Sequence, residues 1–391
     1  VPEGCTHNAH MYYIKVHDME VRTRLIRYLR EKGVRLYLNN SVKAMDGGTV
    51  VLQDGKVYAD MVVLAVGVRP ETALAVQCGI PCNSRGAIVV NRRMQTGVPG
   101  IYAVGDAAEV RDFITNAPAF IPLAGPANKQ GRIAADNIAG IASEYTGTQG
   151  SAVLKIFDMT VATTGLNEKN AAAAGIDYDK AYTYSASHAS YYPGGSNMSI
   201  KALWDKKTKR LIGAQIVGFD GVDKRMDVLA AAIRFGAKIT DLTELELCYA
   251  PPFGSAKDPV NMLGYVGENI VTGKVRQFFW HDVEFLPRDG SVTLLDVRTL
   301  TETARGGIDG FVNIPLDSLR ERLHELPKDK PVYVHCHSGL RSYIACRILE
   351  QNGFACRNLA GGYRLYEMME KDKKDMAAVA GKCAACGMEI S

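Results

Sequence analysis

The sequence contains no apolar run long enough to cross a membrane, and it carries little surplus charge of either sign. Its longest apolar stretches, such as residues 61–68, are far shorter than the roughly 18 residues that a membrane-spanning helix needs, and no signal peptide is visible. The 46 Lys and Arg residues nearly balance the 42 Asp and Glu residues, and no basic block resembles a nucleic-acid-binding arm. We therefore expect neither a membrane nor a nucleic acid as a partner.

The sequence also lacks the cysteine pattern of a disulfide-stabilised secreted protein. Nine cysteines, an odd number, are spread over 391 residues, which favours a reducing, cytoplasmic location. At about 150 residues per domain, this length predicts two or three domains. Because the chain starts with Val1 and its first fifteen residues show no clear pattern, we expect it to be a fragment.

Apolar spacing and turn residues predict alternating helices and strands in the N-terminal part. A helix is expected at 18–32, where apolar residues recur at helical spacing until Gly33. Strands are expected at 34–38, 48–53 and 56–60, the last two joined by a tight Asp54-Gly55 turn. Residues 61–66 and 100–104 are interpreted as buried strands, the second closed by Gly105-Asp106, and a helix follows at 125–141.

The C-terminal half continues the α/β pattern. Antiparallel strands are expected around 203–217, then a helix at 221–235 and a linker or first strand at 278–286. A compact unit follows, with strands at 293–297, 331–335 and 355–359 and helices near 316–326 and at 339–352. Residues 371–391 are expected to be a polar tail. Its Cys383-x-x-Cys386 pair is half a zinc site, a redox dithiol or part of an exposed tail, and we predict no metal site.

The strongest chemical signal is Cys336, which lies between the expected strand 331–335 and the expected helix 339–352. Backbone N–H groups converge at such a junction and the helix dipole is positive there, so a thiolate or persulfide anion is stabilised. Arg341 adds a positive charge, and Gly339 lets the loop curl around the sulfur. The alternative is that Cys336 is an ordinary buried cysteine.

The loop from Cys336 to Arg341 is one residue shorter than the loop with which cysteine phosphatases hold a tetrahedral phosphate, and the smaller ring suits a single sulfur atom. It resembles the Cys-x-x-Gly-x-Arg-Ser loop of the rhodanese (sulfurtransferase) family, and the segments 294–298, 310–316 and 359–363 agree in order and spacing. The resemblance implies a rhodanese domain over 276–370 with Cys336 and Arg341 as catalytic residues. The other loop residues would bind the substrate: His337, Ser338, Gly339, Leu340 and Ser342. Behind the loop, Asp296 and Arg298 are expected to form an ion pair, and Cys346 and Cys356 to lie in the core.

A second signal comes from two apolar segments that each meet a glycine, 63–70 at Gly67 and 100–106 at Gly105. α/β folds bind cofactors where strands end in this way. The pair resembles the pyridine nucleotide–disulfide oxidoreductases. This resemblance implies that Asp106 bonds the ribityl chain of FAD and that the helix after Leu123 and Ala124 points its positive end at the flavin ring. Lys129 and Gln130 are either helix-surface residues or part of this site.

The sequence has no G-x-G-x-x-G phosphate loop, and Cys5, Cys78 and Cys82 lack the context of the redox cysteine of this family. We therefore expect the chain to lack roughly the first 150–180 residues of a typical two-nucleotide flavoprotein. The complete protein is expected to bind FAD and NAD(P)H.

Three further stretches, 155–165, 187–194 and 249–259, resemble the dimerisation domain of coenzyme A–disulfide reductases, in the form fused to a rhodanese domain. The resemblance implies a homodimer in which Tyr191 and Tyr249 reach the redox cysteine of the partner, where a phenol donates a hydrogen bond or a proton to the departing sulfur. Alternatively, both tyrosines fill a half-wet interface. Lys257 is expected to face the phosphates of a CoA-type substrate, and His188 to be a structural interface residue.

The predicted fold is therefore α/β: the remainder of FAD- and NAD(P)-binding domains at 1–150, an α+β dimerisation domain at 151–273, the rhodanese domain at 276–370 and a tail at 371–391. The predicted function is the FAD- and NAD(P)H-dependent reduction of CoA persulfide, polysulfide or CoA disulfide, with coenzyme A as substrate or carrier and Cys336 carrying sulfane sulfur. Two alternatives stay open. One is a stand-alone sulfurtransferase on a non-catalytic flavoprotein scaffold, and the other is an NADH oxidase-type flavoprotein with a regulatory rhodanese module.

Overall fold

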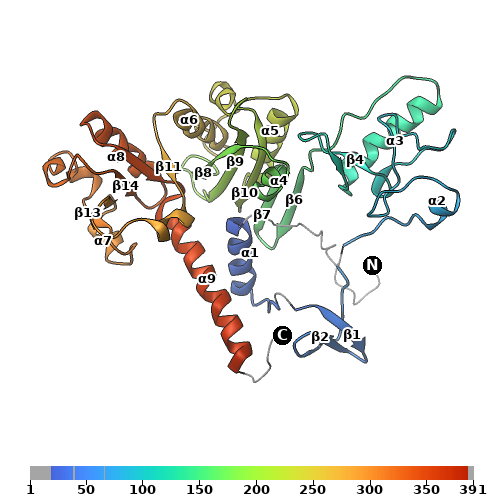
Figure 1. Ribbon diagram of the computed structural model, residues 1–391, viewed down its shortest axis with the longest axis horizontal. Helices are drawn as coiled ribbons and strands as arrows, with labels where there is room; N and C mark the ends of the chain where they lie inside the picture. The colour runs from blue at the N-terminus through green and yellow to red at the C-terminus, as the bar shows by residue number, and fades with distance from the viewer. Residues whose placement is uncertain (1–18, 38–39, 66, 386–391) are drawn as a thin grey trace. The chain divides into compact units, whose positions relative to one another are not determined.

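The computed structural model describes residues 19–37, 40–65 and 67–385. The chain divides into two compact units (Figure 1). Of the described residues, the first contains 24–112 and 116–148, and the second contains 19–23, 113–115 and 149–385.

The N-terminal elements confirm the predicted helix and hairpin. Helix α1 (Met19–Glu31) is closed by Gly33, whose φ of +79° suits a residue without a side chain. Strands β2 (Thr49–Leu52) and β3 (Lys56–Tyr58) pair antiparallel around the turn at Gly55, which has φ +105°. Strand β1 (Val42–Asp46), which the sequence analysis did not predict, pairs with β2 to make a three-stranded sheet.

Three predicted strands in this part of the chain are wrong. Residues 34–37, 61–65 and 100–104 form no strand, apart from a single bridge between Tyr102 and Gln95. Positions 38 and 66 lie outside the described residues. Met61 and Leu64 are 69% and 65% exposed, so the segment 61–65 is not buried either. An apolar run becomes a buried parallel strand only where neighbouring strands take its backbone hydrogen bonds, and the described residues pair none with this segment.

The rest of the first unit is built around helix α3 (Ala124–Ile138), which confirms the helix predicted near 125–141. Short elements surround it: α2 (Ala73–Gln77), the 3₁₀ turn η1 (Gly105–Ala107) and the strand pair β4 (Val110–Arg111) and β5 (Pro118–Ala119). Met94, Val110, Ala134 and Tyr145 form the buried core of this unit.

The second unit begins with a five-stranded antiparallel sheet in the order β6-β7-β10-β9-β8. Its strands are β6 (Ala152–Ile156), β7 (Met159–Gly165), β8 (Tyr178–Ala186), β9 (Asn197–Asp205) and β10 (Leu211–Gly218). Helices α5 (Val222–Arg234) and α6 (Pro259–Val271) pack on one face, where Trp204 and Ile216 are buried. Helix α4 (Glu168–Ala173) packs on the other face, against Leu203 and Ile212. The predicted antiparallel strands and the helix at 221–235 are confirmed.

A buried charge cluster lies at β8 and β9. Glu168 of α4 pairs with Lys180 and Lys201, both nearly buried. Burial by itself would raise the pKa of Glu168, but the two ammonium groups outweigh it and lower that pKa to about 2. The ammonium group of Lys180 also lies 4.3 Å from the ring centroid of Phe279, so the cluster extends to the residue that follows β11 (Gln277–Phe278), the first strand of the next sheet.

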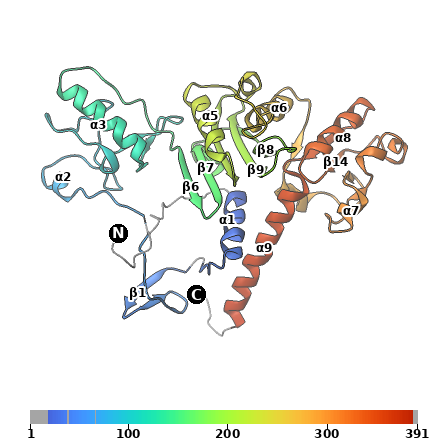
Figure 2. The ribbon, with the colours of Figure 1, turned by 180° about the vertical axis from the view of Figure 1, so that it is seen from behind.

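The second sheet of this unit is entirely parallel, in the order β11-β15-β14-β12-β13. Its strands are β11 (Gln277–Phe278), β12 (Thr293–Asp296), β13 (Val312–Asn313), β14 (Val332–His335) and β15 (Cys356–Leu359). Helix α8 (Leu340–Gln351) packs against β14 and β15 (Figure 2). Helix α7 (Leu300–Thr303) follows β12, and helix α9 (Gly362–Ala385) follows β15. The remaining short elements are 3₁₀ turns: η2 (Ile239–Glu244), η3 (Trp280–Phe285), η4 (Leu316–Ser318) and η5 (Leu323–Glu325).

One prediction for this region is wrong. Residues 316–326 form the two 3₁₀ turns η4 and η5 rather than one α-helix. Leu326 has extended backbone angles, which Pro327 favours because proline disfavours the helical region for the residue before it. The expected polar tail is helical as far as Ala385, since α9 continues through it. Cys386 lies outside the described residues.

Candidate functional site

Cys336 lies where the sequence analysis expects it, between the end of β14 and the start of α8. Its side chain is 1% exposed. The Sγ atom accepts a hydrogen bond from the backbone N–H of Gly339 at 3.1 Å and one from the hydroxyl of Ser342 at 3.2 Å. Gly339 has φ +106°, in the left-handed region that glycine adopts without strain. The loop therefore curls around the sulfur and offers it two donors at a helix N-terminus.

Two backbone hydrogen bonds join the loop to the start of α9. The backbone N–H of Tyr363 donates to the carbonyl of Cys336 at 2.8 Å, and the N–H of Arg364 donates to the carbonyl of His337 at 2.9 Å. Gly362 makes this approach possible, because a Cβ there would lie 2.8 Å from the Cys336 carbonyl oxygen and 2.7 Å from that of His337. The glycine pair at 361–362 thus fixes the loop that carries Cys336.

Arg341, in the first turn of α8, forms an ion pair with Glu302. Its two terminal nitrogens donate to the carboxylate of Glu302 at 2.7 and 2.6 Å. Glu302 also accepts hydrogen bonds from the backbone N–H and the hydroxyl of Thr299, at 3.0 and 2.9 Å. The hydrogen bonds from Arg341, above all, hold the pKa of Glu302 near 2. The sequence analysis missed Glu302, although Thr299-x-x-Glu302 is a capping-box pattern.

A buried charged layer lies behind the loop. Asp296 and Arg298 form the expected ion pair at 2.7 Å, and both side chains are almost fully buried. The guanidinium of Arg298 lies 4.1 Å from the ring centroid of Tyr363. His335 is buried beside Asp296, and burial is the main cause that lowers its pKa to about 4. His335 is therefore neutral at pH 7 and adds no charge to the loop.

The remaining loop residues line the mouth of the site. His337 and Leu340 are exposed, and Ser338 is half-buried. Burial first, and then the positive charge of Arg364, lowers the pKa of His337. Cys346 and Cys356 are buried in the core behind the loop, as expected. Of the six predicted loop positions around Cys336, Gly339 and Ser342 donate hydrogen bonds to its sulfur.

The two predicted tyrosines meet in the second unit, on loops outside the parallel sheet. Tyr191 follows β8 and Tyr249 follows η2, and their hydroxyl groups lie 3.0 Å apart. Tyr191 is 75% exposed and Tyr249 is 48% exposed. The hydrogen bond with Tyr191, more than any other cause, raises the pKa of Tyr249. Two phenol groups therefore stand together on an open surface.

Arg225 of α5, which the sequence analysis missed, ties these two loops together. Its buried guanidinium pairs with Asp258 at 2.9 Å and donates to the carbonyl oxygens of Ser187 and Phe253 at 2.8 and 3.4 Å. The N–H of Ala189 also donates to the carbonyl of Gly254 at 2.7 Å. Nothing in the sequence pattern of α5 distinguishes Arg225 from a surface arginine, so no local signal could have found it.

The two other residues predicted for this region differ in burial. His188 is 5% exposed, and its Nδ1 lies 3.1 Å from the carbonyl oxygen of Ala189. This position is that of a structural histidine. Lys257 is exposed, and it stands next to Asp258, which holds Arg225.

The expected flavin residues are only partly brought together. Asp106 is exposed on η1, and the N–H of the preceding Gly105 donates to the Oε1 of Gln130 at 2.7 Å. Gln130 is 1% exposed, so it is not a helix-surface residue. Lys129 is exposed. Helix α3 starts after Leu123 without a side-chain cap and has no acidic residue in its first turn, so its N–H groups are available to a polar ligand.

Gly67 does not join this group. It lies in the exposed segment that follows residues 61–65, and a Cβ at this position would meet no atom within 4 Å. The sequence motif G-x-G-x-x-G of dinucleotide phosphate loops does not occur in the chain. Among the described residues, Asp106 and the start of α3 therefore fit the ribityl and ring end of FAD, and no such loop is present for its phosphates.

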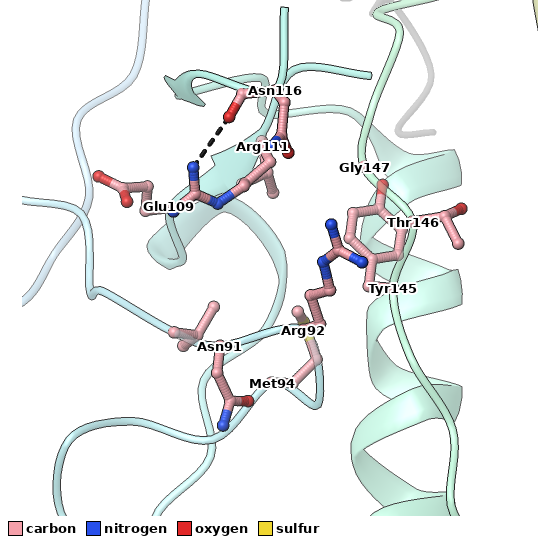
Figure 3. A pocket seen from close by; sticks show the side chains of 11 residues that line it. Asn91, Arg92, Met94, Glu109, Arg111, Asn116, Tyr145, Thr146 and Gly147 are labelled. Atoms are coloured by element: carbon pink, nitrogen blue, oxygen red, sulfur yellow. Dashed lines mark hydrogen bonds between the residues drawn. The ribbon is translucent and has the colours of Figure 1, made fainter. Parts of the chain in front are cut away.

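One cavity of the first unit lies apart from all the predicted site residues. It has a volume of about 450 Å³, and Arg92, Glu109, Arg111 and Tyr145 are among its lining residues (Figure 3). Arg111 donates to the carbonyl oxygen of Asn116 at 2.8 Å. No thiol or histidine lines this cavity, so it lacks the groups that sulfur transfer needs.

The absence of metal-ligand clusters and of membrane-spanning helices concerns only the part of the chain that the structure describes. There, no three potential metal ligands among His, Cys, Asp and Glu come together. None of the described helices is both long and apolar enough to span a membrane.

Comparison with family models gives three consecutive matches. Residues 7–127 match the pyridine nucleotide-disulphide oxidoreductase model, and residues 151–259 match the dimerisation domain of the same family. Residues 281–369 match the rhodanese-like domain. Together the first two matches cover more than half of the chain.

Two known proteins are similar to 64% of the chain. The NAD(P)H coenzyme A polysulfide/persulfide reductase of Pyrococcus horikoshii is 38% identical over 253 residues, which cover 64% of this chain and 56% of the relative. The coenzyme A disulfide reductase of Staphylococcus epidermidis is 34% identical, over 64% of this chain and 57% of the relative.

Two solved structures are also similar. The reduced CoADR-RHD of Bacillus anthracis has a TM-score of 0.87 and 45% identity, over 91% of this chain and 64% of its own. The NAD-dependent persulfide reductase of A. fulgidus has a TM-score of 0.79 and 36% identity, over 89% of this chain and 64% of its own. The chain thus spans between half and two thirds of the length of these relatives.

Proposed function

Because the chain belongs to the pyridine nucleotide-disulphide oxidoreductase family and ends in a rhodanese-like domain, we propose that it is part of a flavin-dependent NAD(P)H oxidoreductase. Its substrate would be CoA persulfide or polysulfide, or CoA disulfide, and Cys336 would carry the sulfane sulfur. The names of the relatives, a coenzyme A polysulfide/persulfide reductase and a coenzyme A disulfide reductase, support this substrate class.

The observation that carries the proposal is the environment of the Cys336 sulfur. It is buried, it accepts hydrogen bonds from Gly339 and Ser342, and it lies at the positive end of α8. Such a nest stabilises a thiolate, and it stabilises the terminal sulfur of a persulfide equally well.

The first step is a sulfur transfer. The thiolate of Cys336 attacks the outer sulfur of a donor R–S–SH, a new S–S bond forms, and the old S–S bond breaks to release R–S⁻. Cys336 then holds –S–SH, and no electrons are gained or lost overall. The mouth residues His337, Ser338 and Leu340 would contact the donor, and Arg341 would orient it.

Reduction takes place at a second site. When bound, FAD and NAD(P)H supply the two electrons that convert a sulfur–sulfur bond to thiol and hydrosulfide. In this chain, Asp106 would hold the ribityl hydroxyl groups, and Gly105, Leu123 and Ala124 would line the approach to the ring. Gly67 keeps its predicted role only if the segment around it is reorganised.

The exposed tyrosine pair suits an interface between two copies of the chain. In a cytoplasmic homodimer formed by the dimerisation domain, Tyr191 and Tyr249 would stand next to a reacting cysteine of the other copy and donate a hydrogen bond to the departing sulfur. Lys257 would face the phosphate groups of coenzyme A. The domains would be the FAD- and NAD(P)-binding part at 1–150, the dimerisation domain at 151–273, the rhodanese domain at 276–370 and the segment 371–391.

The test is an NADH-consumption assay on the full-length protein loaded with FAD. CoA persulfide and CoA disulfide are compared as substrates for the wild type and for Cys336→Ser. The proposal expects faster turnover on the persulfide, release of hydrosulfide, and loss of that advantage in Cys336→Ser. Equal turnover on both substrates, unchanged by Cys336→Ser, would contradict it and favour a flavoprotein whose rhodanese domain is only regulatory. A protein that binds no flavin would instead favour the stand-alone sulfurtransferase.

A further inference from the structure

The ion pair between Arg341 and Glu302 determines how much positive charge the mouth of the Cys336 site offers. Both terminal nitrogens of Arg341 are directed at the two carboxylate oxygens of Glu302, at 2.7 and 2.6 Å. Each side chain is about one third exposed, so the pair lies at the rim of the site rather than in the core. The Glu302 carboxylate therefore already accepts hydrogen bonds from the two guanidinium nitrogens to which a bidentate anionic ligand would otherwise bind.

Glu302 is itself held in place. It occupies the third position of α7, and its Oε2 accepts from the N–H and the hydroxyl of Thr299, at 3.0 and 2.9 Å. Thr299 in turn accepts from the N–H of Glu302. This reciprocal capping fixes the carboxylate, so Glu302 does not leave Arg341 without breaking the start of the helix.

Arg364 is a second cation beside His337, since its backbone N–H donates to the carbonyl of His337. The guanidinium of Arg364 lies 4.6 Å from the ring centroid of Tyr184. His337 does not supply a compensating charge, because burial and Arg364 lower its pKa. At the rim of the loop, Glu302 thus offsets the positive charge of Arg341, while Arg364 keeps its own.

This balance affects sulfane sulfur donors unequally. With thiosulfate, the Cys336 thiolate takes the outer sulfur, the S–S bond breaks, and sulfite leaves with both electrons of that bond and a double negative charge. With a thiol persulfide, the same bond change releases a thiolate that carries a single charge at its reacting end, and the phosphate groups of CoA persulfide lie at the far end of the donor. A carboxylate at the rim repels the doubly charged sulfite more strongly than this singly charged thiolate end, and a guanidinium already paired with a carboxylate compensates neither.

We propose that Glu302 sets the donor specificity of Cys336, excluding oxyanion donors such as thiosulfate and admitting persulfides and polysulfides of thiols. The inference rests on the proposed function, because it assumes that Cys336 accepts sulfane sulfur. It assigns to Glu302 a role in specificity and none in the transfer itself.

The test measures how fast Cys336 gains one sulfur atom, by mass spectrometry of the 391-residue chain, with thiosulfate and with CoA persulfide as separate donors. The readout is the ratio of the two rates. Glu302→Gln keeps an acceptor for Thr299, because glutamine also serves in a capping box, but it removes the negative charge. The thiosulfate-to-persulfide ratio is expected to rise about tenfold or more in this variant.

Two further variants make the result decisive. Glu302→Asp keeps the charge and should keep the low ratio of the wild type. Glu325→Gln removes one carboxylate from the exposed Arg322–Glu325 pair of the same domain and should also leave the ratio unchanged. A ratio for Glu302→Gln within about twofold of the wild type, or an equal rise in Glu302→Asp or Glu325→Gln, would overturn the inference while the proposed function stands. If the wild type gains sulfur from neither donor, the proposed function fails and the inference fails with it.

Discussion

The buried Asp296–Arg298 pair supports the loop of Cys336, and its removal should destabilise this domain strongly. Arg298 donates three side-chain hydrogen bonds to the Asp296 carboxylate, at 3.1, 3.0 and 2.7 Å, and its N–H donates a fourth at 2.9 Å. Both side chains are almost fully buried. In Asp296→Ala, the guanidinium keeps only the carbonyl of Gly306 and the ring of Tyr363 as partners.

The magnitude follows from the burial of the charge. Removing one partner of a buried pair leaves an uncompensated ion and costs about 3–5 kcal/mol. The matched control is Glu325→Ala, which removes the carboxylate of a surface pair in the same domain whose side chains are 38% and 40% exposed. Such a surface pair contributes about 0–1 kcal/mol.

Hydrogen exchange of the amides in β14 and α8 is the assay, because it reports the opening free energy of this domain even if the rest of the chain unfolds separately. Asp296→Ala should lower that free energy by about 3–5 kcal/mol, and Glu325→Ala by less than about 1 kcal/mol. Equal losses in the two variants would refute the reasoning, because they would mean that burial of the Asp296 pair makes no difference to its contribution.

Three other predictions concern the rest of the chain. The pKa of Glu168 is about 2 in the folded chain and ordinary in the unfolded chain, so the contribution of this carboxylate to stability is complete above about pH 4.5 and is lost as the pH falls toward 2. Acid unfolding of Glu168→Gln should therefore depend less on pH over that range. An unchanged acid-unfolding profile would contradict the lowered pKa. Tyr191→Phe should lower the pKa of Tyr249 toward its ordinary value, because the Tyr191 hydroxyl is the main cause of the rise, and ultraviolet absorbance in an alkaline titration measures the shift. Gly362→Ala should reduce sulfur uptake and stability much more than Gly353→Ala does. Both glycines have positive φ, but only a Cβ at 362 would collide with backbone atoms. A similar loss in both variants would show that the close approach of Gly362 to the Cys336 loop is unimportant.

The most accurate predictions from the sequence concern features formed by residues that are close together in the chain. The strand, loop and helix around Cys336 are contiguous, and Gly339, Ser342 and the sulfur meet because they are close in the chain. The antiparallel sheet of the second unit was also predictable from short connections and alternation. The Asp296–Arg298 pair was predictable for the same reason, since only one residue lies between its partners.

Predictions failed where the cause is distant in the sequence. Residues 61–65 are apolar enough for a buried strand, but the described chain pairs no neighbour with them, and pairing rather than composition makes a strand. Glu302 reaches Arg341 across 39 positions, and Arg225 reaches Asp258 across 33. No periodicity in one sequence shows which charged side chains meet over such separations.

The most direct test of the central claim is to locate the sulfur. The 391-residue chain is treated with CoA persulfide, freed of the donor and analysed by peptide mass spectrometry, with Cys336→Ser as the control. The account predicts one added sulfur atom on Cys336, none on the buried Cys346 and Cys356, and none at position 336 in the variant. An unmodified Cys336, or equal sulfur uptake by Cys336→Ser, would contradict the claim that this loop carries sulfane sulfur.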